Sequence, residues 1–555
     1  MKVIVVGGVA AGMSFAARAR RLNEDAQIIV LERGEYVSFA NCGLPYFVGG
    51  EITDPDRLLV QTPQKLRDAL NLDVRVRHEV TAVDTQAQTV TIQTPSGPTT
   101  ETYDVLFLAP GAEAMRLPIP GIDSDRVLTL RTVDDARQMR AQVEAGIKRA
   151  VVLGAGFIGL EAAEALAQTG VDVTVVELAD HVLPPLEVEV AHPVQDELGR
   201  LGIKTHLGVA ASAIRPGVDS DTVVLADGTE LQADLICLSA GVVPATAPFA
   251  AAGIETVRGA IVVDERGRTS APNVYAAGDA VASTDQITGE VRPVALAGPA
   301  NRAGRLIADF VMRGEAARPL PRPLGTAIVR VGRLTAAMTG ANRAALERNH
   351  IAHTTLHLHP NQHAGYFPGA SQISLVVHIG EDGRLLGAQA VGEEGVDKRI
   401  DVLATAIRAQ LHVEDLIDLD LSYSPPYGQA KDAVNLVGMV GANVLDGTLR
   451  LWYPAEYEEV AQSSLILDTR SRAEYETGYL PGSLNIPHTE LRDRLDEVRG
   501  AASGRPVRVL CASGVRSAIA HRLLTQSGFD SASLSGGITS LRQYLGKRAD
   551  TVIKV

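Results

Sequence analysis

Two of the three cysteines have neighbours suited to sulfur chemistry, and Cys42 is the first of them. It lies in SFANCGLPYFVGG, residues 38–50, and Val37 and Phe47 stand five positions before and after it, so no second thiol is near. A single thiolate can attack a sulfur–sulfur bond and be regenerated when electrons arrive. Because the thiolate is the reactive form, its pKa must be lowered by a cofactor or a helix N-terminus. Cys42 is predicted to be catalytic.

Cys511 lies in VRVLCASGVRS, residues 507–517, where a strand ends and a short loop precedes a helix. Such a loop directs backbone N–H groups inward as an anion nest, which favours a thiolate and then a persulfide. Arg516 and the helix dipole add to this. Because Arg516 follows Cys511 by only five residues, the loop is one residue tighter than the phosphatase pattern C-x-x-x-x-x-R and favours a sulfur nucleophile.

The other thiol, Cys237, falls in the apolar run ADLICLSAG and is predicted to be a core residue. Three cysteines exclude a disulfide scaffold and suit a reducing compartment. No Cys/His cluster has the spacing of a zinc site, so no metal is expected.

A glycine-rich turn in residues 151–159, VVLGAGFIG, lies between a strand and a helix. Gly154, Gly156 and Gly159 complete the pattern G-x-G-x-x-G, which allows a tight turn and close approach of the backbone to a pyrophosphate at the helix N-terminus. The next strand ends at Glu177, whose carboxylate suits a ribose 2′-hydroxyl and repels a 2′-phosphate. The pattern therefore favours NADH over NADPH.

The N-terminal opening, MKVIVVGGVAAG, has the same plan with one departure. Gly7 and Gly12 hold the first and third glycine positions, while Val9 stands in the middle and must point away from a pyrophosphate. The following strand ends in Glu32, again suited to a ribose. The two openings indicate a duplicated nucleotide-binding fold.

Two later segments indicate which dinucleotide each fold binds. Asp279 lies in TSAPNVYAAGDA, residues 269–280, where its carboxylate is free to accept a sugar hydroxyl, and YDVLFLAPG, residues 103–111, is another strand ending at a tight turn. These stretches resemble FAD-contact motifs of the flavoprotein disulfide reductases with two dinucleotide-binding domains, over about residues 1–440. The resemblance implies FAD in the first fold and NADH in the second.

The pattern S-x-x-N-C-G-L-P-Y around Cys42, with GGVAAGMS near the N-terminus, resembles the coenzyme A disulfide reductases, including persulfide reductases with a fused rhodanese domain. In that family the single cysteine forms a mixed disulfide with coenzyme A (CoA). Arg18 and Arg21 share a helix face that suits a phosphate, although a solvated charged face is the alternative. Asn301 stands where the family often has a histidine, a departure from its CoA contacts. The resemblance implies a CoA site at Ser14, Arg18, Arg21, Ser38, Asn41 and Lys431.

HAGYFPGA, residues 363–370, and LSYSPPYGQAKD, residues 421–432, also resemble family motifs. In the family they belong to the domain that forms the dimer and supplies tyrosines to the partner's active site. This implies a homodimer in which Tyr366 and Tyr423 are catalytic, with Tyr427 a weaker candidate. A phenol beside Cys42 would hydrogen-bond a departing thiolate; ordinary packing is the alternative.

Residues 465–487, 507–517 and 534–537 follow one another as in a single rhodanese domain, which residues 459–555 resemble. The predicted fold class is therefore α/β, with two Rossmann-like dinucleotide-binding domains, an α+β dimerisation domain and a C-terminal rhodanese-like α/β domain. The expected boundaries are residues 1–110 plus 240–318 for FAD, 111–239 for NADH, 319–445 for dimerisation, 446–458 for a linker, and 459–555 for the rhodanese domain.

A formal charge of −14 argues against non-specific binding of nucleic acid. The N-terminus lacks the apolar run of a signal peptide, and no run is long enough to span a bilayer, so the expected location is the cytoplasm, without membrane attachment.

Together the residues predict NADH-dependent reduction of CoA persulfide, polysulfide or CoA disulfide through FAD and Cys42, with sulfane sulfur carried by Cys511. The expected partners are small-molecule thiols, disulfides or persulfides. One alternative is an NADH oxidase or peroxidase that uses Cys42 as a sulfenic acid. Another is a non-enzymatic sulfur relay or redox sensor.

Overall fold

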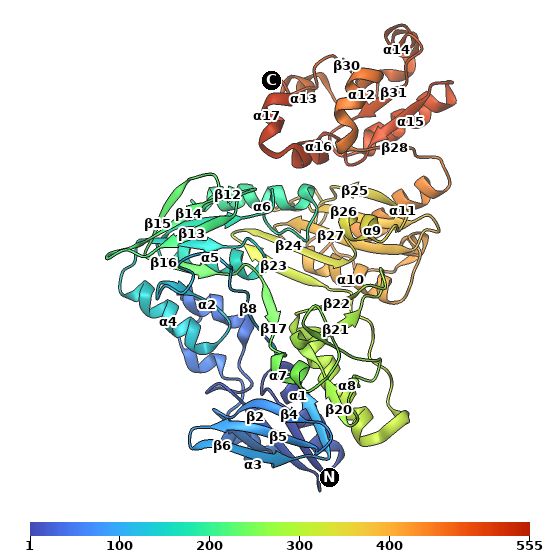
Figure 1. The fold of residues 1–555 in the computed structure, drawn as a ribbon. Helices are drawn as coiled ribbons and strands as arrows, with labels where there is room; N and C mark the ends of the chain where they lie inside the picture. Colours follow the sequence, from blue (N-terminus) through green and yellow to red (C-terminus); the bar gives the residue numbers. More distant parts are fainter. The chain divides into compact units, whose positions relative to one another are not determined.

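The computed structural model describes residues 1–555, whose contacts form two compact units. The first unit comprises residues 1–180 and 201–325, and the second comprises residues 181–200 and 326–555. Figure 1 labels many of the helices and strands of both units.

The first unit contains a five-stranded parallel sheet built around the N-terminal strand. Its strands are rich in β-branched residues and almost wholly buried, as expected for a parallel sheet covered on both faces. Helix α1 (Ala10–Leu22) follows the first strand, and its Phe15 stacks on Phe107 with ring centroids 4.1 Å apart. The strand order is β20 (Val274–Ala276), β7 (Val105–Leu108), β1 (Lys2–Val6), β2 (Gln27–Glu32), β3 (Asp73–Val76).

A second parallel sheet in this unit repeats the plan. Helix α5 (Phe157–Gln168) follows its central strand as α1 follows β1. Cys237 lies on this sheet with no exposed surface, and burial, with a smaller effect of Asp135, raises the pKa of its thiol to about 12. The two sheets confirm the expected pair of Rossmann-like folds. The strand order is β12 (Lys204–Leu207), β11 (Asp172–Glu177), β10 (Arg149–Leu153), β16 (Leu235–Leu238), β9 (Val127–Leu128).

The second unit begins with a five-stranded antiparallel sheet. Helices α10 (Val396–Arg408) and α6 (Val188–Arg200) both pack against its central strands. Helix α6 lies inside the segment predicted to bind NADH, yet its contacts place it in this unit, because its buried residues face the antiparallel sheet. The strand order is β23 (Ala327–Val331), β24 (Leu334–Gly340), β27 (Leu385–Gly392), β26 (Ser374–Gly380), β25 (His353–Leu358).

The rest of the second unit is a parallel sheet flanked by helices. Its edge strand β28 lies within residues 446–458, which were expected to be a linker. Trp452 on this strand is only 2% exposed and donates its indole N–H to the Val509 carbonyl at 3.2 Å. A two-residue strand is too short to show a period in the sequence. The strand order is β28 (Leu451–Trp452), β32 (Ser531–Leu534), β31 (Val507–Leu510), β29 (Leu465–Asp468), β30 (Leu484–Asn485).

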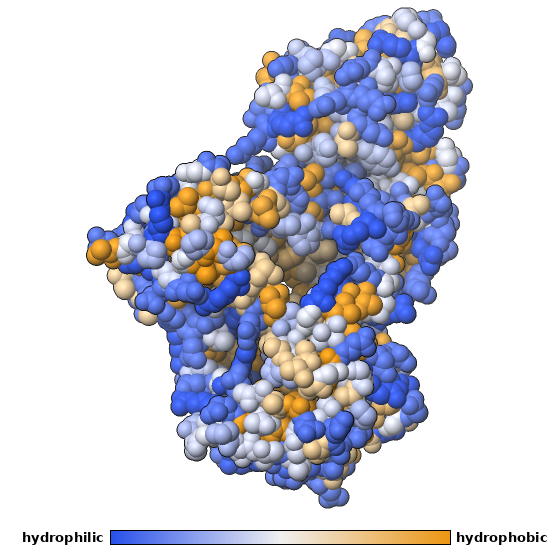
Figure 2. Space-filling model, viewed as in Figure 1, coloured by the Kyte–Doolittle hydropathy of each residue, from blue (hydrophilic) through white to orange (hydrophobic).

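Apolar residues are scattered over the face drawn in Figure 2 and gather only in small groups. None of the helices combines the length and the apolar character that crossing a bilayer requires. No group of three or more His, Cys, Asp or Glu side chains is arranged to hold a metal ion.

Candidate functional site

The glycine turn before α5 has the shape that a bound pyrophosphate requires. Gly154 has a φ of 108°, and a Cβ there would lie 2.5 Å from the Ser239 carbonyl oxygen. A Cβ on Gly159 would lie 2.0 Å from the Gly154 oxygen, so the helix packs directly on the turn. Gly156, in contrast, has nothing within 4 Å of such a Cβ, which leaves open space beside the first turn of α5. The turn therefore fits a dinucleotide phosphate.

The N-terminal turn is closed in the same way. A Cβ on Gly12 would lie 1.8 Å from the Gly7 oxygen, and one on Gly7, whose φ is 93°, would lie 2.0 Å from the Ala109 oxygen. Val9 is the residue immediately before α1, so the missing middle glycine does not prevent the turn. The residues present fit a second dinucleotide, as FAD binding requires.

The two acidic strand ends also match each other. Glu32 accepts hydrogen bonds from the backbone N–H of Gly8 at 2.7 Å and of Gly34 at 2.8 Å. Glu177 accepts them from Ala155 at 2.7 Å and Ala179 at 2.9 Å. Each carboxylate is thus fixed beside its glycine turn, and its remaining lone pairs can accept a sugar hydroxyl.

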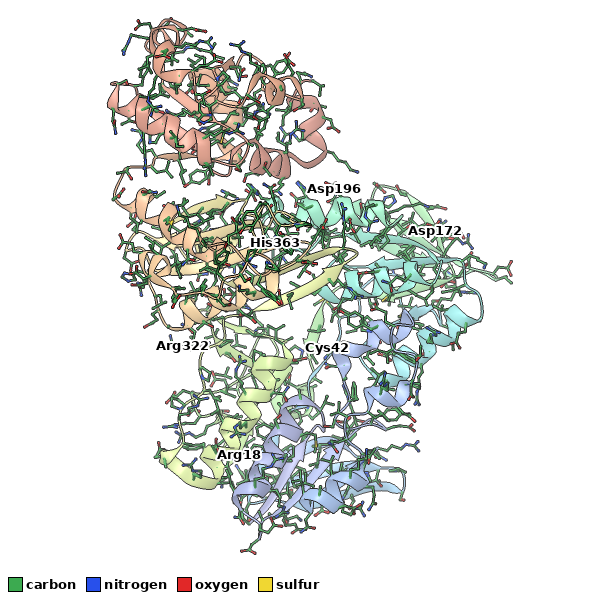
Figure 3. The ribbon with its side chains drawn as sticks, turned by 180° about the vertical axis from the view of Figure 1, so that it is seen from behind. Arg18, Cys42, Asp172, Asp196, Arg322 and His363 are labelled. Carbon is green, nitrogen blue, oxygen red and sulfur yellow. The ribbon has the colours of Figure 1, made fainter.

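Cys42 lies in a short 3₁₀ turn (Asn41–Gly43) ahead of α2 (Leu44–Val48), in the first unit (Figure 3). Its thiol is exposed and 3.8 Å from the Asn41 Oδ1 atom. Desolvation raises the pKa of Cys42, and the carboxylates of Glu161 and Asp279 raise it further. The surrounding protein therefore disfavours the thiolate form of Cys42. The lower pKa that reactivity requires must come from a bound cofactor or substrate.

Two neighbours of this site were not predicted from the sequence. The Tyr46 hydroxyl, one helical turn after Cys42, donates to Glu161 Oε1 at 3.3 Å. Arg131 donates to Asp279 Oδ2 at 3.2 Å, so the carboxylate predicted to accept a sugar hydroxyl is paired with a cation. Neither Tyr46–Glu161 nor Arg131–Asp279 has a local sequence pattern, because each pair joins residues far apart in the chain.

Cys511 lies at the end of β31, only 1% exposed, in the loop before α15 (Val515–Gln526). The backbone N–H of Gly514 donates to its Sγ at 3.2 Å, and the Ser517 hydroxyl lies 3.4 Å from it. The sulfur therefore has one backbone N–H directed at it and a hydroxyl within reach.

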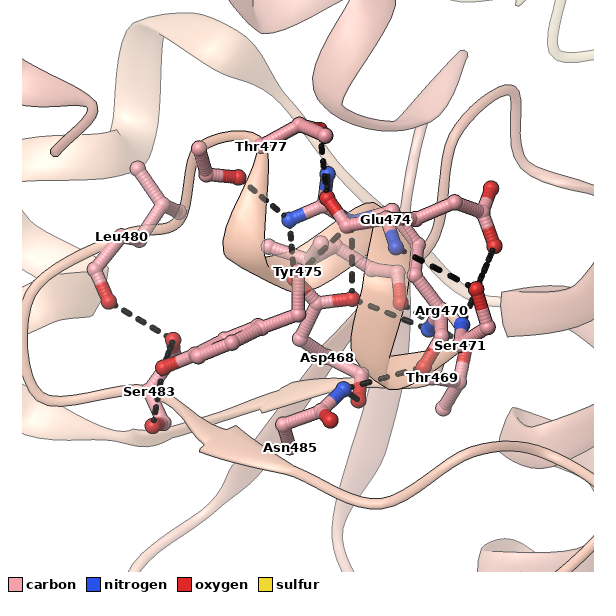
Figure 4. Close-up of polar contacts among 12 residues, drawn as sticks. Asp468, Thr469, Arg470, Ser471, Glu474, Tyr475, Thr477, Leu480, Ser483 and Asn485 are labelled. Carbon is pink, nitrogen blue, oxygen red and sulfur yellow. Dashed lines mark hydrogen bonds and ion pairs between the residues drawn. The ribbon is translucent and has the colours of Figure 1, made fainter. Parts of the chain in front are cut away.

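Arg516 is held beside this loop by an acidic partner. Both of its terminal nitrogens donate to Glu474, at 2.7 and 2.6 Å, and this pairing is the largest cause that lowers the pKa of Glu474 to about 2. Glu474 is fixed in turn because it accepts the Ser471 backbone N–H in a capping box (Figure 4). Asp468 and the buried Arg470 form a second ion pair at 2.6 Å in the same network.

Three family models match successive parts of the chain. Residues 1–299 match the pyridine nucleotide-disulphide oxidoreductases, residues 326–434 match the dimerisation domain of those enzymes, and residues 453–543 match the rhodanese-like domain. The coenzyme A disulfide reductase of Staphylococcus haemolyticus is 34% identical over 442 residues, which are 79% of this chain and 98% of that protein. The chain belongs to the pyridine nucleotide-disulphide oxidoreductase family.

Solved structures extend the likeness to the rhodanese part of this oxidoreductase. The reduced Bacillus anthracis protein described as CoADR-RHD is 40% identical, with a TM-score of 0.96 and 99% and 98% of the two chains covered. The NAD-dependent persulfide reductase of A. fulgidus is 36% identical, with a TM-score of 0.90 and coverage of 97% and 100%. The water-forming NADH oxidase of Lactobacillus brevis is 26% identical, with a TM-score of 0.77, and covers only 81% of this chain.

The residues predicted to hold CoA lie on both units of the oxidoreductase. Ser14 donates to Asn301 at 2.6 Å, and Arg18, labelled in Figure 3, pairs with Asp309 of α8 (Ala297–Arg313) at 2.6 Å. Arg21 is exposed and forms no hydrogen bond or ion pair, so its charge is more available than that of Arg18. Ser38, with a φ of 51°, and Asn41 belong to the first unit, and Lys431 is exposed on the second.

The predicted tyrosines form an exposed pair in the second unit. The Tyr366 and Tyr423 hydroxyls lie 3.3 Å apart, and the side chains are 77% and 48% exposed. This hydrogen bond is the largest cause that raises the pKa of Tyr366. The buried Arg399 steadies both segments, because its Nη2 donates at 2.7 Å to the Gln362 carbonyl and to Asp432. Tyr427 is also exposed.

Proposed function

We propose that the protein is an NADH-dependent reductase of CoA persulfide or CoA disulfide, in which Cys511 carries sulfane sulfur. The carrying observation is that one chain combines the exposed single thiol Cys42 with a buried thiol that faces a backbone N–H at the start of α15. The relatives named for CoA disulfide and persulfide reduction, one of them aligned over nearly the whole chain, support this reading.

Cys511 begins the proposed sequence of sulfur transfers. Its thiolate takes one sulfane sulfur from a polysulfide, which leaves one sulfur shorter. The resulting persulfide gives the outer sulfur to the CoA thiol, which becomes CoA persulfide while the Cys511 thiolate is restored. The Cys42 thiolate then attacks the inner sulfur of CoA persulfide, forming a Cys42–CoA mixed disulfide and releasing hydrosulfide. Two electrons from NADH reduce the mixed disulfide to the Cys42 thiolate and CoA. For CoA disulfide the same attack releases CoA thiolate instead.

The cofactor residues follow from the two glycine turns. Gly7, Gly12, Glu32 and Asp279 would hold FAD, which supplies the path for two electrons from NADH to Cys42. A separate set would hold NADH, and the fixed carboxylate of Glu177 disfavours the 2′-phosphate of NADPH. This second set is Gly154, Gly156, Gly159 and Glu177.

We infer that CoA binds along α1 and the segment before Cys42, at Ser14, Arg18, Arg21, Ser38 and Asn41, with Lys431 as a further contact. We also infer a homodimer in which Tyr366 and Tyr423 serve the partner's active site, since exposed aromatic residues in a dimerisation domain suit an interface. Three free thiols suit the cytoplasm, and the charge of −14 disfavours a nucleic-acid partner.

The test is steady-state NADH oxidation with CoA persulfide, polysulfide and CoA disulfide. Cys42→Ser should abolish turnover with all three, whereas Cys511→Ser should retain reduction of CoA disulfide. Cys237→Ala, which removes the unrelated core thiol, is the matched control and should keep turnover with all three substrates. Full activity of Cys42→Ser would contradict the proposal, and rapid oxygen consumption without a sulfur substrate would favour an oxidase.

A further inference from the structure

A buried histidine of the antiparallel sheet contacts the rhodanese part of the second unit. His357 on β25 donates its backbone N–H to Ser535 Oγ at 3.1 Å, and its Nδ1 lies 2.8 Å from the same oxygen. Its Nε2 lies 3.3 Å from Glu189 Oε1 on α6. His357, Ser535 and Glu189 are 5%, 2% and 2% exposed.

The His357 ring links Ser535 to Glu189. Ser535 Oγ accepts the His357 backbone N–H, and its own hydrogen can donate to Nδ1 of a neutral ring. Nε2 is placed to donate to Glu189, whose charge is offset by Arg343 at 3.3 Å. Burial would raise the pKa of Glu189, but His357 and Arg343 lower it to about 2. An acid–histidine–hydroxyl chain this deeply buried has no access to substrate, so its effect must pass through what Ser535 supports.

Ser535 is the first residue of the segment 535–539, which supports the loop that begins at Cys511. Ile538 and Thr539 donate backbone N–H groups to the carbonyls of Cys511 and Ala512, at 2.9 and 3.1 Å. The two glycines between Ser535 and Ile538 are closely packed. A Cβ on Gly536 would lie 2.8 Å from the His357 Cβ, and one on Gly537 would lie 2.5 Å from the Cys511 oxygen. The path from His357 to the Cys511 backbone is continuous and closely packed.

We propose that His357 is a positioning residue for sulfur transfer, which fixes the Cys511 loop from outside the rhodanese part. The proposal rests on the sulfur-carrier role proposed above for Cys511. Losing the bonds to Ser535 frees residues 535–539, shifts the carbonyls they hold, and turns the Gly514 N–H away from Cys511 Sγ, so the thiolate and persulfide lose their donor. The charged groups beside Cys511 are Arg516 and its partner Glu474, which the substitution does not touch.

The variants distinguish the hydrogen bond that His357 forms with Ser535 from the one that it forms with Glu189. His357→Leu removes both side-chain bonds, Ser535→Ala removes the hydroxyl alone, and His357→Asn keeps an acceptor where Nδ1 stood. His353→Gln is the matched control, because His353 lies on the same strand but bonds only the Ile351 carbonyl and packs on His378. All are made in the full-length, FAD-loaded protein.

Three readouts are compared. Thiosulfate gives its outer sulfur to the Cys511 thiolate with release of sulfite, and cyanide removes that sulfur as thiocyanate. The pH profile of Cys511 alkylation is measured in a Cys42→Ser background, and NADH oxidation with CoA disulfide reports the reductase.

His357→Leu and Ser535→Ala should lower the kcat of thiocyanate formation about fivefold and move the alkylation profile to higher pH. His357→Asn should recover part of the loss, while His353→Gln should match the unmodified protein and reduction of CoA disulfide should stay unchanged throughout. An unmodified protein that forms no thiocyanate would refute the proposed carrier role. If it does form thiocyanate, the inference is overturned by a His357→Leu variant with unaltered kcat and profile, or by one in which both activities fall together without rescue by His357→Asn.

Discussion

At the scale of single residues, the two thiols that we propose to be reactive have opposite surroundings. Cys42 is exposed, yet desolvation and the carboxylates of Glu161 and Asp279 raise its pKa. Cys511 is buried and has the Gly514 N–H aimed at its sulfur. Cys42 therefore needs a cofactor or substrate to favour its thiolate, whereas the protein itself supplies a hydrogen-bond donor to Cys511.

Glu161→Gln should make Cys42 more reactive at neutral pH, because removing a nearby negative charge lowers the pKa of the thiol. We expect alkylation by iodoacetamide to quicken about threefold, measured by mass spectrometry of the Cys42 peptide. Glu144→Gln, at the exposed end of α4 (Val133–Glu144), is the control. Unchanged or slower alkylation of Cys42 would show that Glu161 does not oppose the thiolate.

Glu177→Ala should relax the choice of dinucleotide, because the 2′-hydroxyl loses its acceptor and a 2′-phosphate loses its repulsion. The KM for NADH should rise about tenfold while that for NADPH falls. Asp172→Asn, at the other end of strand β11 and paired with Lys204, should leave both KM values unchanged. An unaltered ratio of the two KM values would contradict the role given to Glu177.

Sequence reasoning reached the residues that belong to local patterns and missed those that do not. The glycine turns, Cys42 and the Cys511 loop each occupy one short segment and were predicted. Their partners Arg131, Glu161 and Glu474 come from distant segments, and only the folded chain brings them to Asp279, Cys42 and Arg516. The roles assigned to the cysteines, the cofactor residues, the CoA residues and the tyrosines all remain predictions.

At the scale of elements, close packing of helix on turn is what each nucleotide-binding fold depends on. Gly12→Ala would place a methyl group 1.8 Å from the Gly7 oxygen, so α1 must move away from the turn. We expect loss of about 1–3 kcal/mol of stability and of bound FAD, measured by thermal unfolding and by absorbance of the released flavin.

Gly199→Ala is the control for this substitution, because Gly199 lies in α6 with nothing within 4 Å of the added atom. That variant should be as stable as the unmodified protein or slightly more so. Full FAD content and stability in Gly12→Ala would contradict the close approach.

The elements that sequence reasoning misplaced share a cause. Helix α6 was assigned to the NADH-binding segment by its position in the chain, and β28 was assigned to a linker because two residues show no period. In both, tertiary packing decides: α6 packs on the antiparallel sheet, and Trp452 fills the rhodanese core. The strands with a strong period in the sequence could be predicted without knowledge of tertiary packing.

At the scale of the whole molecule, acid should weaken the second unit. His359 lies between the hydroxyls of Ser374 and Ser540, at 3.0 and 2.7 Å, and burial lowers its pKa from 6.5 to about 3. The folded form holds the neutral ring, so its stabilisation is complete above pH 6.5 and is lost as the pH falls toward 3. His378 and His521, whose pKa values burial also lowers, act in the same direction.

Urea unfolding followed by Trp452, the single tryptophan, should report this loss from within the rhodanese core. The midpoint should fall steadily as the pH drops below 6.5, and His359→Gln should flatten the slope while leaving the part that His378 and His521 contribute. A midpoint independent of pH over this range would contradict the buried neutral histidine.

Because helix α6 belongs to the second unit, the chain cannot be divided into two complete units at a single position. A fragment that began at Thr326 would keep every strand of the antiparallel sheet and the entire rhodanese part. It would leave behind Glu187 and Glu189, which face His378 and His357 at 3.1 and 3.3 Å. Recombination that grafts this C-terminal half onto another flavoprotein must therefore bring a compatible stretch from the middle of the host's nucleotide-binding fold. The second unit is therefore assembled from two separate segments of the chain, residues 181–200 and 326–555.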